Sequence, residues 1–226
     1  RQAIALRSDY PEAHYNLGNT LKELGRLDEA LASYRQAIAL KPDYPEAHNN
    51  LGNTLKDLGR LIEAEVSYRL AVAHKSDYAA AHYNLGIALQ EMGKRQEAQV
   101  SLRQAIVLKH DFTEAHENLG TMLQESGKLE EAEASYRHAI ALKSDNAETH
   151  NNLGHTLSEL DRFEEAEASY RQAIELKFDY AEAHYNLGST LQELGRSEDA
   201  EASYRRAIVL KSDFAAAYYN LGATLQ

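Results

Sequence analysis

The chain has 226 residues, of which 43% are hydrophobic and 26% are charged, and this composition is typical of a soluble globular protein. No cysteine is present, which excludes disulfide frameworks and thiolate chemistry, and no apolar run approaches the roughly 18 to 20 residues that span a membrane. The formal net charge of −11 disfavours nucleic acid as a partner. These features leave the compartment open, although a cytoplasmic location is favoured.

Internal repetition organises the whole sequence. Residues 1–10 match residues 35–44, so we expect the chain to open with the end of a preceding repeat. Six complete repeats of 34 residues follow, and a seventh is truncated after its first helix. The complete repeats are predicted at 11–44, 45–78, 79–112, 113–146, 147–180 and 181–214, and the truncated one at 215–226.

Each repeat is predicted to contain two amphipathic helices and no strand. In the first repeat, small or apolar residues recur at helical spacing in both halves. In the first half they are Ala13, Leu17, Leu21 and Leu24. In the second half they are Ala30, Tyr34, Ala37 and Ile38.

Two kinds of residue predict where these helices begin and end. The sequence Asp43-Tyr44-Pro45-Glu46 has the form of a capping box, in which the Asp43 side chain accepts from an amide at the helix start. Gly25 follows the first helix, at a place where a left-handed conformation is expected. Asp161 takes the place of this glycine in the fifth repeat, and Asp visits that conformation more readily than most residues.

A second glycine lies inside the first helix of every repeat, at Gly18 and its equivalents. Glycine costs about 1 kcal/mol of helix propensity relative to alanine. A cost borne in every repeat predicts close contact between the two helices of a hairpin. Ala30 and Ala37 are the expected partners, small residues facing a small residue.

The pattern resembles the tetratricopeptide repeat family. The residues that carry the resemblance are Leu17 next to Gly18 in the first helix, Ala30 and Tyr34 in the second, and Pro42 near the end of the repeat. The resemblance covers the whole chain. It implies an all-α fold, a right-handed α-solenoid or superhelix of 34-residue helix-turn-helix hairpins, with a concave groove lined mainly by the first helices.

Histidines and acidic residues invite metal and enzyme hypotheses that the repeat pattern disfavours. Six histidines occupy the place of His14, one per repeat, and neighbouring first helices stand about 10 Å apart. Ligands of one metal ion must converge within about 2 Å of it. Acidic residues such as Glu29 also recur once per repeat, whereas catalysis needs one singular constellation. We therefore predict packing histidines, no metal, no cofactor and no enzymatic activity.

Charged pairs at i,i+4, such as Glu65 with Arg69, are expected on the solvated outer face of the second helices.

An asparagine stands at one place in every first helix. Helical periodicity places Asn16 on a second stripe with Tyr15 and Asn19, away from the core. A carboxamide donates and accepts hydrogen bonds, so a line of them suits the main chain of an extended peptide. The alternative is that each asparagine bonds a neighbouring helix and fixes the hairpin geometry, and the two roles are compatible. The set is Asn16, Asn50, Asn84, Asn118, Asn152, Asn186 and Asn220.

This line of asparagines, the asparagine ladder, resembles the superhelix that precedes the catalytic domain of O-linked N-acetylglucosamine transferases. The resemblance implies that the seven asparagines hold a peptide backbone. Glutamates at the rim, such as Glu12, favour a neutral or basic peptide and no nucleic acid or membrane. The further candidates for peptide binding are Tyr15, Tyr83, Tyr185, Tyr219, Asn19 and Asn53.

Two other functions stay open. The chain begins and ends inside repeats, so its ends are predicted to expose complementary apolar surfaces that favour head-to-tail self-association. Alternatively, the repeats are the substrate-selecting arm of a larger enzyme such as a glycosyltransferase.

Overall fold

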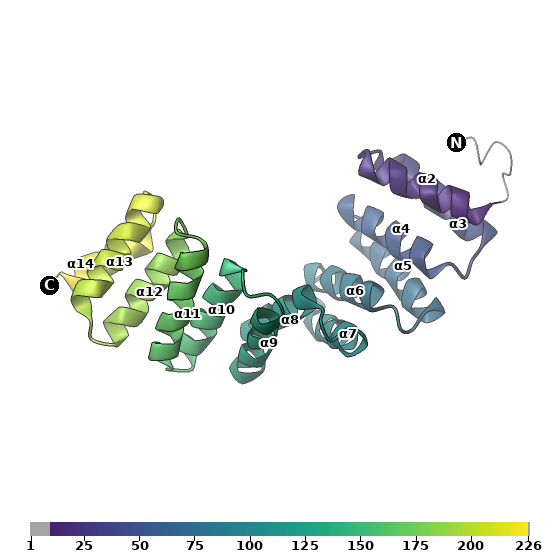
Figure 1. The fold of residues 1–226 in the computed structure, drawn as a ribbon. Helices are drawn as coiled ribbons and strands as arrows, with labels where there is room; N and C mark the ends of the chain where they lie inside the picture. The colour runs from purple at the N-terminus through teal and green to yellow at the C-terminus, as the bar shows by residue number, and fades with distance from the viewer. Residues whose placement is uncertain (1–9, 226) are drawn as a thin grey trace. The chain divides into compact units, whose positions relative to one another are not determined.

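The computed structural model describes residues 10–225, and these residues form thirteen α-helices and no strand. They divide into two compact units, residues up to His110 (unit 1) and residues from Asp111 (unit 2). The all-α prediction is confirmed. The prediction for the opening segment falls on residues 1–9, outside the described residues. Within each unit, successive helices pack as hairpins, and successive hairpins stack as an α-solenoid (Figure 1).

Unit 1 contains three hairpins. Their helices are α2 (Pro11–Glu23), α3 (Leu27–Leu40), α4 (Pro45–Asp57), α5 (Leu61–His74), α6 (Ala79–Glu91) and α7 (Arg95–Leu108). Unit 2 contains three hairpins and one further helix. Its helices are α8 (Thr113–Glu125), α9 (Leu129–Leu142), α10 (Ala147–Glu159), α11 (Phe163–Leu176), α12 (Ala181–Glu193), α13 (Ser197–Leu210) and α14 (Ala215–Thr224).

The helix starts differ from the capping-box prediction. Helix α4 begins at Pro45, and the cap residue is Tyr44, whose side chain makes no capping hydrogen bond. Asp43 therefore lies one residue too early to cap the helix. Proline at the first helical position explains the arrangement, because it needs no amide partner and favours an extended residue before it. Only at Asn146 among the described helix starts does a side chain accept an amide hydrogen bond, from Glu148.

The turns inside the hairpins confirm the glycine prediction. Gly25 has a φ of 72°, and Asp161, in the same place of a later repeat, has a φ of 57°. At the first of these turns, the Gly25 amide donates to the Lys22 carbonyl (2.9 Å) and the Arg26 amide donates to the Leu21 carbonyl (2.9 Å). These bonds satisfy carbonyls that the end of a helix leaves unpaired.

The hairpin core consists largely of alanine, leucine and tyrosine. Tyr34, Ala30 and Ala37 are fully buried, whereas Leu24 follows the end of α2 and is 65% exposed. The nearest neighbour of Gly18 is a tyrosine and not one of the predicted alanines, although at the equivalent Gly86 an added methyl group would lie 3.3 Å from the Ala98 carbonyl oxygen. A methyl group at Gly18 would lie 2.6 Å from the Cε1 atom of Tyr34, so the glycine makes room for a buried tyrosine ring.

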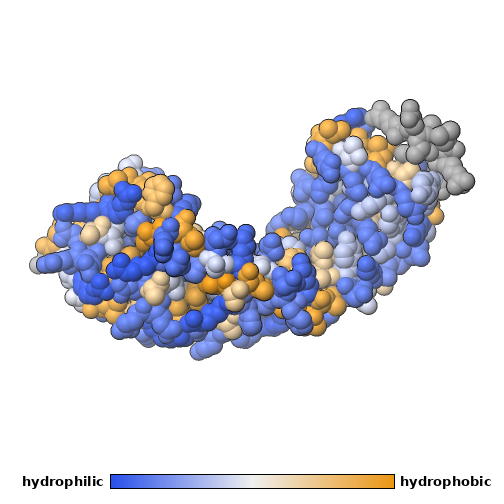
Figure 2. Space-filling view, in the orientation of Figure 1, coloured by the Kyte–Doolittle hydropathy of each residue, from blue (hydrophilic) through white to orange (hydrophobic). Residues whose placement is uncertain are grey.

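The surface in view is mainly hydrophilic, with separate apolar spots on both units (Figure 2). None of the helices formed by residues 10–225 has the length and apolar character needed to cross a membrane.

Candidate functional site

The first helices of the hairpins place the ladder asparagines on one face of each unit. Unit 1 carries Asn16, Asn50 and Asn84 on α2, α4 and α6. Unit 2 carries Asn118, Asn152, Asn186 and Asn220 on α8, α10, α12 and α14, and we call the surface around these four residues the A face of unit 2. Asn16 is exposed, and the other six are half-buried.

Most of the ladder amides bond to the preceding repeat. In unit 1, Asn84 Nδ2 donates to Asn49 Oδ1 at 2.9 Å, and Asn50 Nδ2 donates to the Tyr15 hydroxyl at 3.1 Å. In each pair the acceptor lies 35 positions earlier in the chain. The structural role weighed from the sequence is therefore present, because these bonds tie one hairpin to the next.

Unit 2 repeats this bond twice. Asn186 Nδ2 donates to Asn151 Oδ1 at 3.1 Å, and Asn220 Nδ2 donates to the Tyr185 hydroxyl at 3.3 Å. No described residue donates a hydrogen bond to the amide oxygens of Asn186 and Asn220. The inter-repeat bond thus fixes the orientation of each carboxamide and leaves its oxygen able to accept.

Asn118 and Asn152 differ from these four asparagines. Asn118 Nδ2 donates to the Glu114 carbonyl of its own helix at 2.7 Å. The residue 35 positions before Asn152 is Glu117, whose Oε1 accepts instead from Asn146 Nδ2 (2.7 Å) and the Thr149 hydroxyl (2.6 Å). Asn152 Oδ1 accepts a long bond of 3.5 Å from Asn151. Within residues 10–225, the Asn152 amide nitrogen has no acceptor, so it is available to a ligand.

The other predicted site residues are partly used inside the fold. Asn19 Oδ1 accepts from the Tyr34 hydroxyl at 2.8 Å, and Asn53 Oδ1 accepts from the Tyr68 hydroxyl at 2.8 Å. Burial raises the pKa of both tyrosines. These two asparagines therefore connect the first helix of a hairpin to the second.

The predicted groove tyrosines are less exposed than the sequence indicated. Tyr15 is half-buried, with ring-centroid distances of 5.1 Å to Tyr44 and 6.0 Å to Tyr34. In unit 2, Tyr185 is likewise half-buried and lies 4.9 Å from the Phe214 ring. Tyr83 is also half-buried. Among the four, only Tyr219 is largely exposed, at 78%.

The repeated histidines pack between hairpins. His48 Nε2 lies 2.9 Å from the Pro42 carbonyl, and its ring stacks on His74 with centroids 5.4 Å apart. Burial lowers the pKa of His48, and the bond to Pro42 acts in the opposite direction. Equivalent bonds join His150 to the Ser144 carbonyl. In the part of the chain that the structure describes, no three metal-ligating side chains come together.

The carboxylates predicted on a solvated outer face lie between repeats. Glu133 is paired with Arg137 on its own helix, as expected at i,i+4, and also with Arg162 of the next repeat at 2.6 Å. Its side chain is only 14% exposed. Burial acts to raise the pKa of Glu133, but the two arginines outweigh it and hold the pKa below its usual value. Sequence reasoning missed the second partner, 29 residues away.

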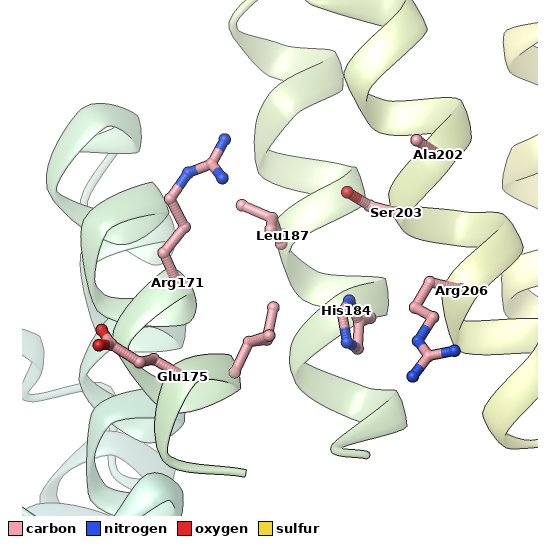
Figure 3. A pocket seen from close by; sticks show the side chains of 8 residues that line it. Arg171, Glu175, His184, Leu187, Ala202, Ser203 and Arg206 are labelled. Atoms are coloured by element: carbon pink, nitrogen blue, oxygen red, sulfur yellow. The ribbon is translucent and has the colours of Figure 1, made fainter. Parts of the chain in front are cut away.

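Sequence reasoning also did not predict the pockets that lie between the second helices of successive hairpins. In unit 2 one pocket of about 390 Å³ lies between α11 and α13, with Arg171 and Arg206 at its sides and His184 and Leu187 from α12 at its floor (Figure 3). Equivalent positions of the preceding repeat line another pocket of about 410 Å³. A distinct pocket of about 270 Å³ opens beside Asn186, on the A face of unit 2.

Comparison with known proteins finds repeat families along the chain. A family model described as TPR repeat matches residues 1–25, 18–59 and 52–93. Models described as tetratricopeptide repeat match residues 79–109, 111–177, 151–213 and 187–225. No curated protein sequence matches the chain.

Solved structures share the fold at low sequence identity. YrrB, a TPR protein with an unusual peptide-binding site, is 22% identical over 83% of this chain and 96% of its own, with a TM-score of 0.77. The pilF protein of Pseudomonas aeruginosa is 20% identical over 94% of this chain and 96% of its own, with a TM-score of 0.78. The MamA protein is 24% identical over 76% of this chain and 93% of its own, with a TM-score of 0.69.

Proposed function

This chain belongs to the tetratricopeptide repeat family, and we propose that it is a non-catalytic scaffold that binds an extended segment of another protein along its ladder asparagines. The observation that carries the proposal is the state of the carboxamides in unit 2. The Asn186 and Asn220 amides are held by the preceding repeat, and Asn152 has an amide nitrogen with no acceptor among residues 10–225. Such groups can accept hydrogen bonds from a peptide main chain and donate hydrogen bonds to it, whatever the side chains of the peptide are.

The spacing of the helices fits an extended ligand. Packed helices stand about 8 to 10 Å apart, and an extended chain advances about 3.3 Å per residue. About three ligand residues therefore separate one ladder asparagine from the next. A segment of roughly seven residues spans the three asparagines Asn152, Asn186 and Asn220, by the same spacing.

The charge of the A face supports a neutral or basic ligand. Glu148 and Glu193 on unit 2 are exposed and make no ion pair with other described residues. A basic segment gains from such carboxylates, whereas an acidic one is repelled. In unit 1, by contrast, Lys22 pairs with Asp57 at 3.2 Å, so part of the negative charge is already neutralised.

The test uses the full chain and linear peptides of 12 residues selected on it by phage display. Asn152→Ala should weaken the best selected peptide by about fivefold to tenfold, the equivalent of one hydrogen bond of about 1 to 1.5 kcal/mol. Its thermal stability should change little, because the hydrogen bond that the described residues lose is the long one of 3.5 Å from Asn151 to Asn152 Oδ1. Gln172→Ala removes a carboxamide from α11 and serves as the matched control.

A second variant separates the two roles of the ladder. Glu117→Asn places at this rung the acceptor type that Asn151 presents to Asn186. It should occupy the Asn152 amide and weaken the peptide as Asn152→Ala does. Unchanged affinity in both variants, measured by isothermal titration calorimetry, would refute the proposal that the ladder holds the ligand.

Self-association is a second candidate function, favoured by exposed apolar residues in α14 and directly after it. Tyr219 is 78% exposed and Leu225 is 58% exposed. The complementary surface predicted from the sequence falls on residues 1–9, outside the described residues. Light scattering over a concentration series tests this candidate, and a constant monomer mass contradicts it. The role of a substrate-selecting arm of a glycosyltransferase stays a prediction.

A further inference from the structure

The pocket beside Asn186 lies where a ligand held by the ladder passes. It is enclosed by the first helices α10 and α12 and by the second helix α11 between them. Its volume is about 270 Å³. Asn186 belongs to the ladder and to the pocket wall, so a ligand residue bonded to Asn186 has its side chain within reach of the pocket. The lining residues are His155, Ser158, Phe163, Tyr170, Asn186, Ser189, Thr190 and Glu193.

Unit 1 shows what occupies the same place in earlier repeats. There the lysine near the end of one first helix pairs with the acidic residue near the end of the next. Lys22 Nζ lies 3.2 Å from Asp57, and Lys56 Nζ lies 3.6 Å from Glu91. Each pair neutralises a carboxylate with a cation from the preceding repeat.

Unit 2 keeps the carboxylates and lacks the lysines. Gln124 stands in place of the first lysine and donates to Glu159 at 3.1 Å. Ser158 stands in place of the second, and its hydroxyl lies 3.1 Å from the Thr190 hydroxyl. No cation in the described part of the chain pairs with Glu193. The Glu193 carboxylate, which lines the pocket, therefore lacks the cationic partner that Asp57 and Glu91 have in unit 1.

The pocket walls suit the stem of a long cationic side chain. Phe163 contributes aromatic surface to the lining and Ser189 contributes a hydroxyl, whereas Tyr170 also lines the pocket but is only 1% exposed. Lysine and arginine bury their methylene stems against apolar surface while the charged end stays near polar groups. A neutral apolar side chain would leave Glu193 without a counter-charge.

We propose that this pocket binds a lysine or arginine side chain of the bound segment, with Glu193 supplying the counter-charge that Lys56 receives from Glu91 in unit 1. This inference rests on the proposed function and specifies its ligand: an extended segment with a basic residue at the position held by Asn186. Because Ser158 stands where unit 1 has a lysine, there is room beside Glu193 for a cation of the ligand.

The experiment compares two variants of the full chain with the wild type. The ligand is the best selected 12-residue peptide, together with a version in which each lysine or arginine in turn is replaced by norleucine. Glu193→Gln should weaken the basic peptide about threefold to fivefold, as expected for an exposed ion pair. One norleucine peptide should bind both proteins equally. Glu198→Gln, an equal change of charge at the start of α13, is the control.

A second variant places a lysine of the protein itself next to Glu193. Ser158→Lys recreates the lysine of unit 1, and its ammonium should pair with Glu193 and exclude the ligand cation. The basic peptide should then bind no better than its norleucine version, while thermal unfolding verifies that the variant folds.

The outcomes separate this inference from the proposed function. If Asn152→Ala weakens the peptide and Glu193→Gln does not, the segment binds the ladder and the cation site is refuted. If neither variant matters, the proposed function fails as well. Selected peptides that lack lysine and arginine would also overturn the inference.

Discussion

Replacing Gly52 by alanine tests the close approach of the two helices in a hairpin. A methyl group at Gly52 would lie 2.6 Å from Cε1, 2.7 Å from Cδ1 and 2.9 Å from Cζ of Tyr68. Carbon atoms in contact prefer about 3.5 to 4.0 Å, so the ring must move by about 1 Å. The Tyr68 ring is fully buried, and its hydroxyl donates to Asn53 at 2.8 Å, which restricts such a movement.

The magnitude follows from two opposing effects. Overpacking a core typically costs about 1 to 3 kcal/mol, and alanine gains about 1 kcal/mol over glycine in helix propensity. Gly52→Ala should therefore destabilise the protein by up to about 2 kcal/mol. Gly222→Ala is the matched control, because nothing lies within 4 Å of its added methyl group. The control should be neutral or stabilising, by up to about 1 kcal/mol.

Urea unfolding followed by circular dichroism measures both variants against the wild type. The predicted order of midpoints is Gly52→Ala below wild type, and Gly222→Ala at or above it. If Gly52→Ala unfolds at the same or a higher urea concentration than Gly222→Ala, the tyrosine ring does not explain the glycine.

Three further predictions concern stability. Glu133→Gln should destabilise the protein by about 1 kcal/mol through loss of charged hydrogen bonds. Because the pKa of Glu133 in the folded protein lies below the usual 4.5, this contribution is present above about pH 4.5 and disappears as the pH falls through the folded pKa. The urea midpoints of the variant and the wild type should therefore converge in acid. Burial raises the pKa of Tyr136 to about 12, so its contribution is complete below pH 10 and is lost as the pH rises towards 12; Tyr136→Phe should reduce the alkaline loss of stability. Asp161→Gly should raise the melting temperature by relieving about 0.5 to 1 kcal/mol of left-handed backbone strain, and an unchanged or lower value would contradict this.

Features fixed by local chemistry could be predicted from the sequence. Gly25 requires only its own backbone conformation, and the two helices of a hairpin require only their own apolar spacing. Features that depend on a second repeat could not be predicted in this way. The Gly18 partner is a tyrosine 16 positions later, and the second partner of Glu133 is 29 positions later. Helical periodicity gives the face of a residue and does not identify the side chain opposite.

The candidate site illustrates the same limit. The sequence places Asn152 and Asn186 in one equivalent position, and periodicity assigns both the same role. The structure distinguishes them through the residue 35 positions earlier, because Asn151 accepts from Asn186 while Glu117 bonds to Asn146 and Thr149. The presence of Glu117 at the position that Asn151 holds in the next repeat thus determines whether a ladder amide holds two hairpins together or is available to a ligand. A repeated residue can consequently join neighbouring repeats at some positions and leave its amide nitrogen unbonded at another, and the difference is encoded outside the residue itself.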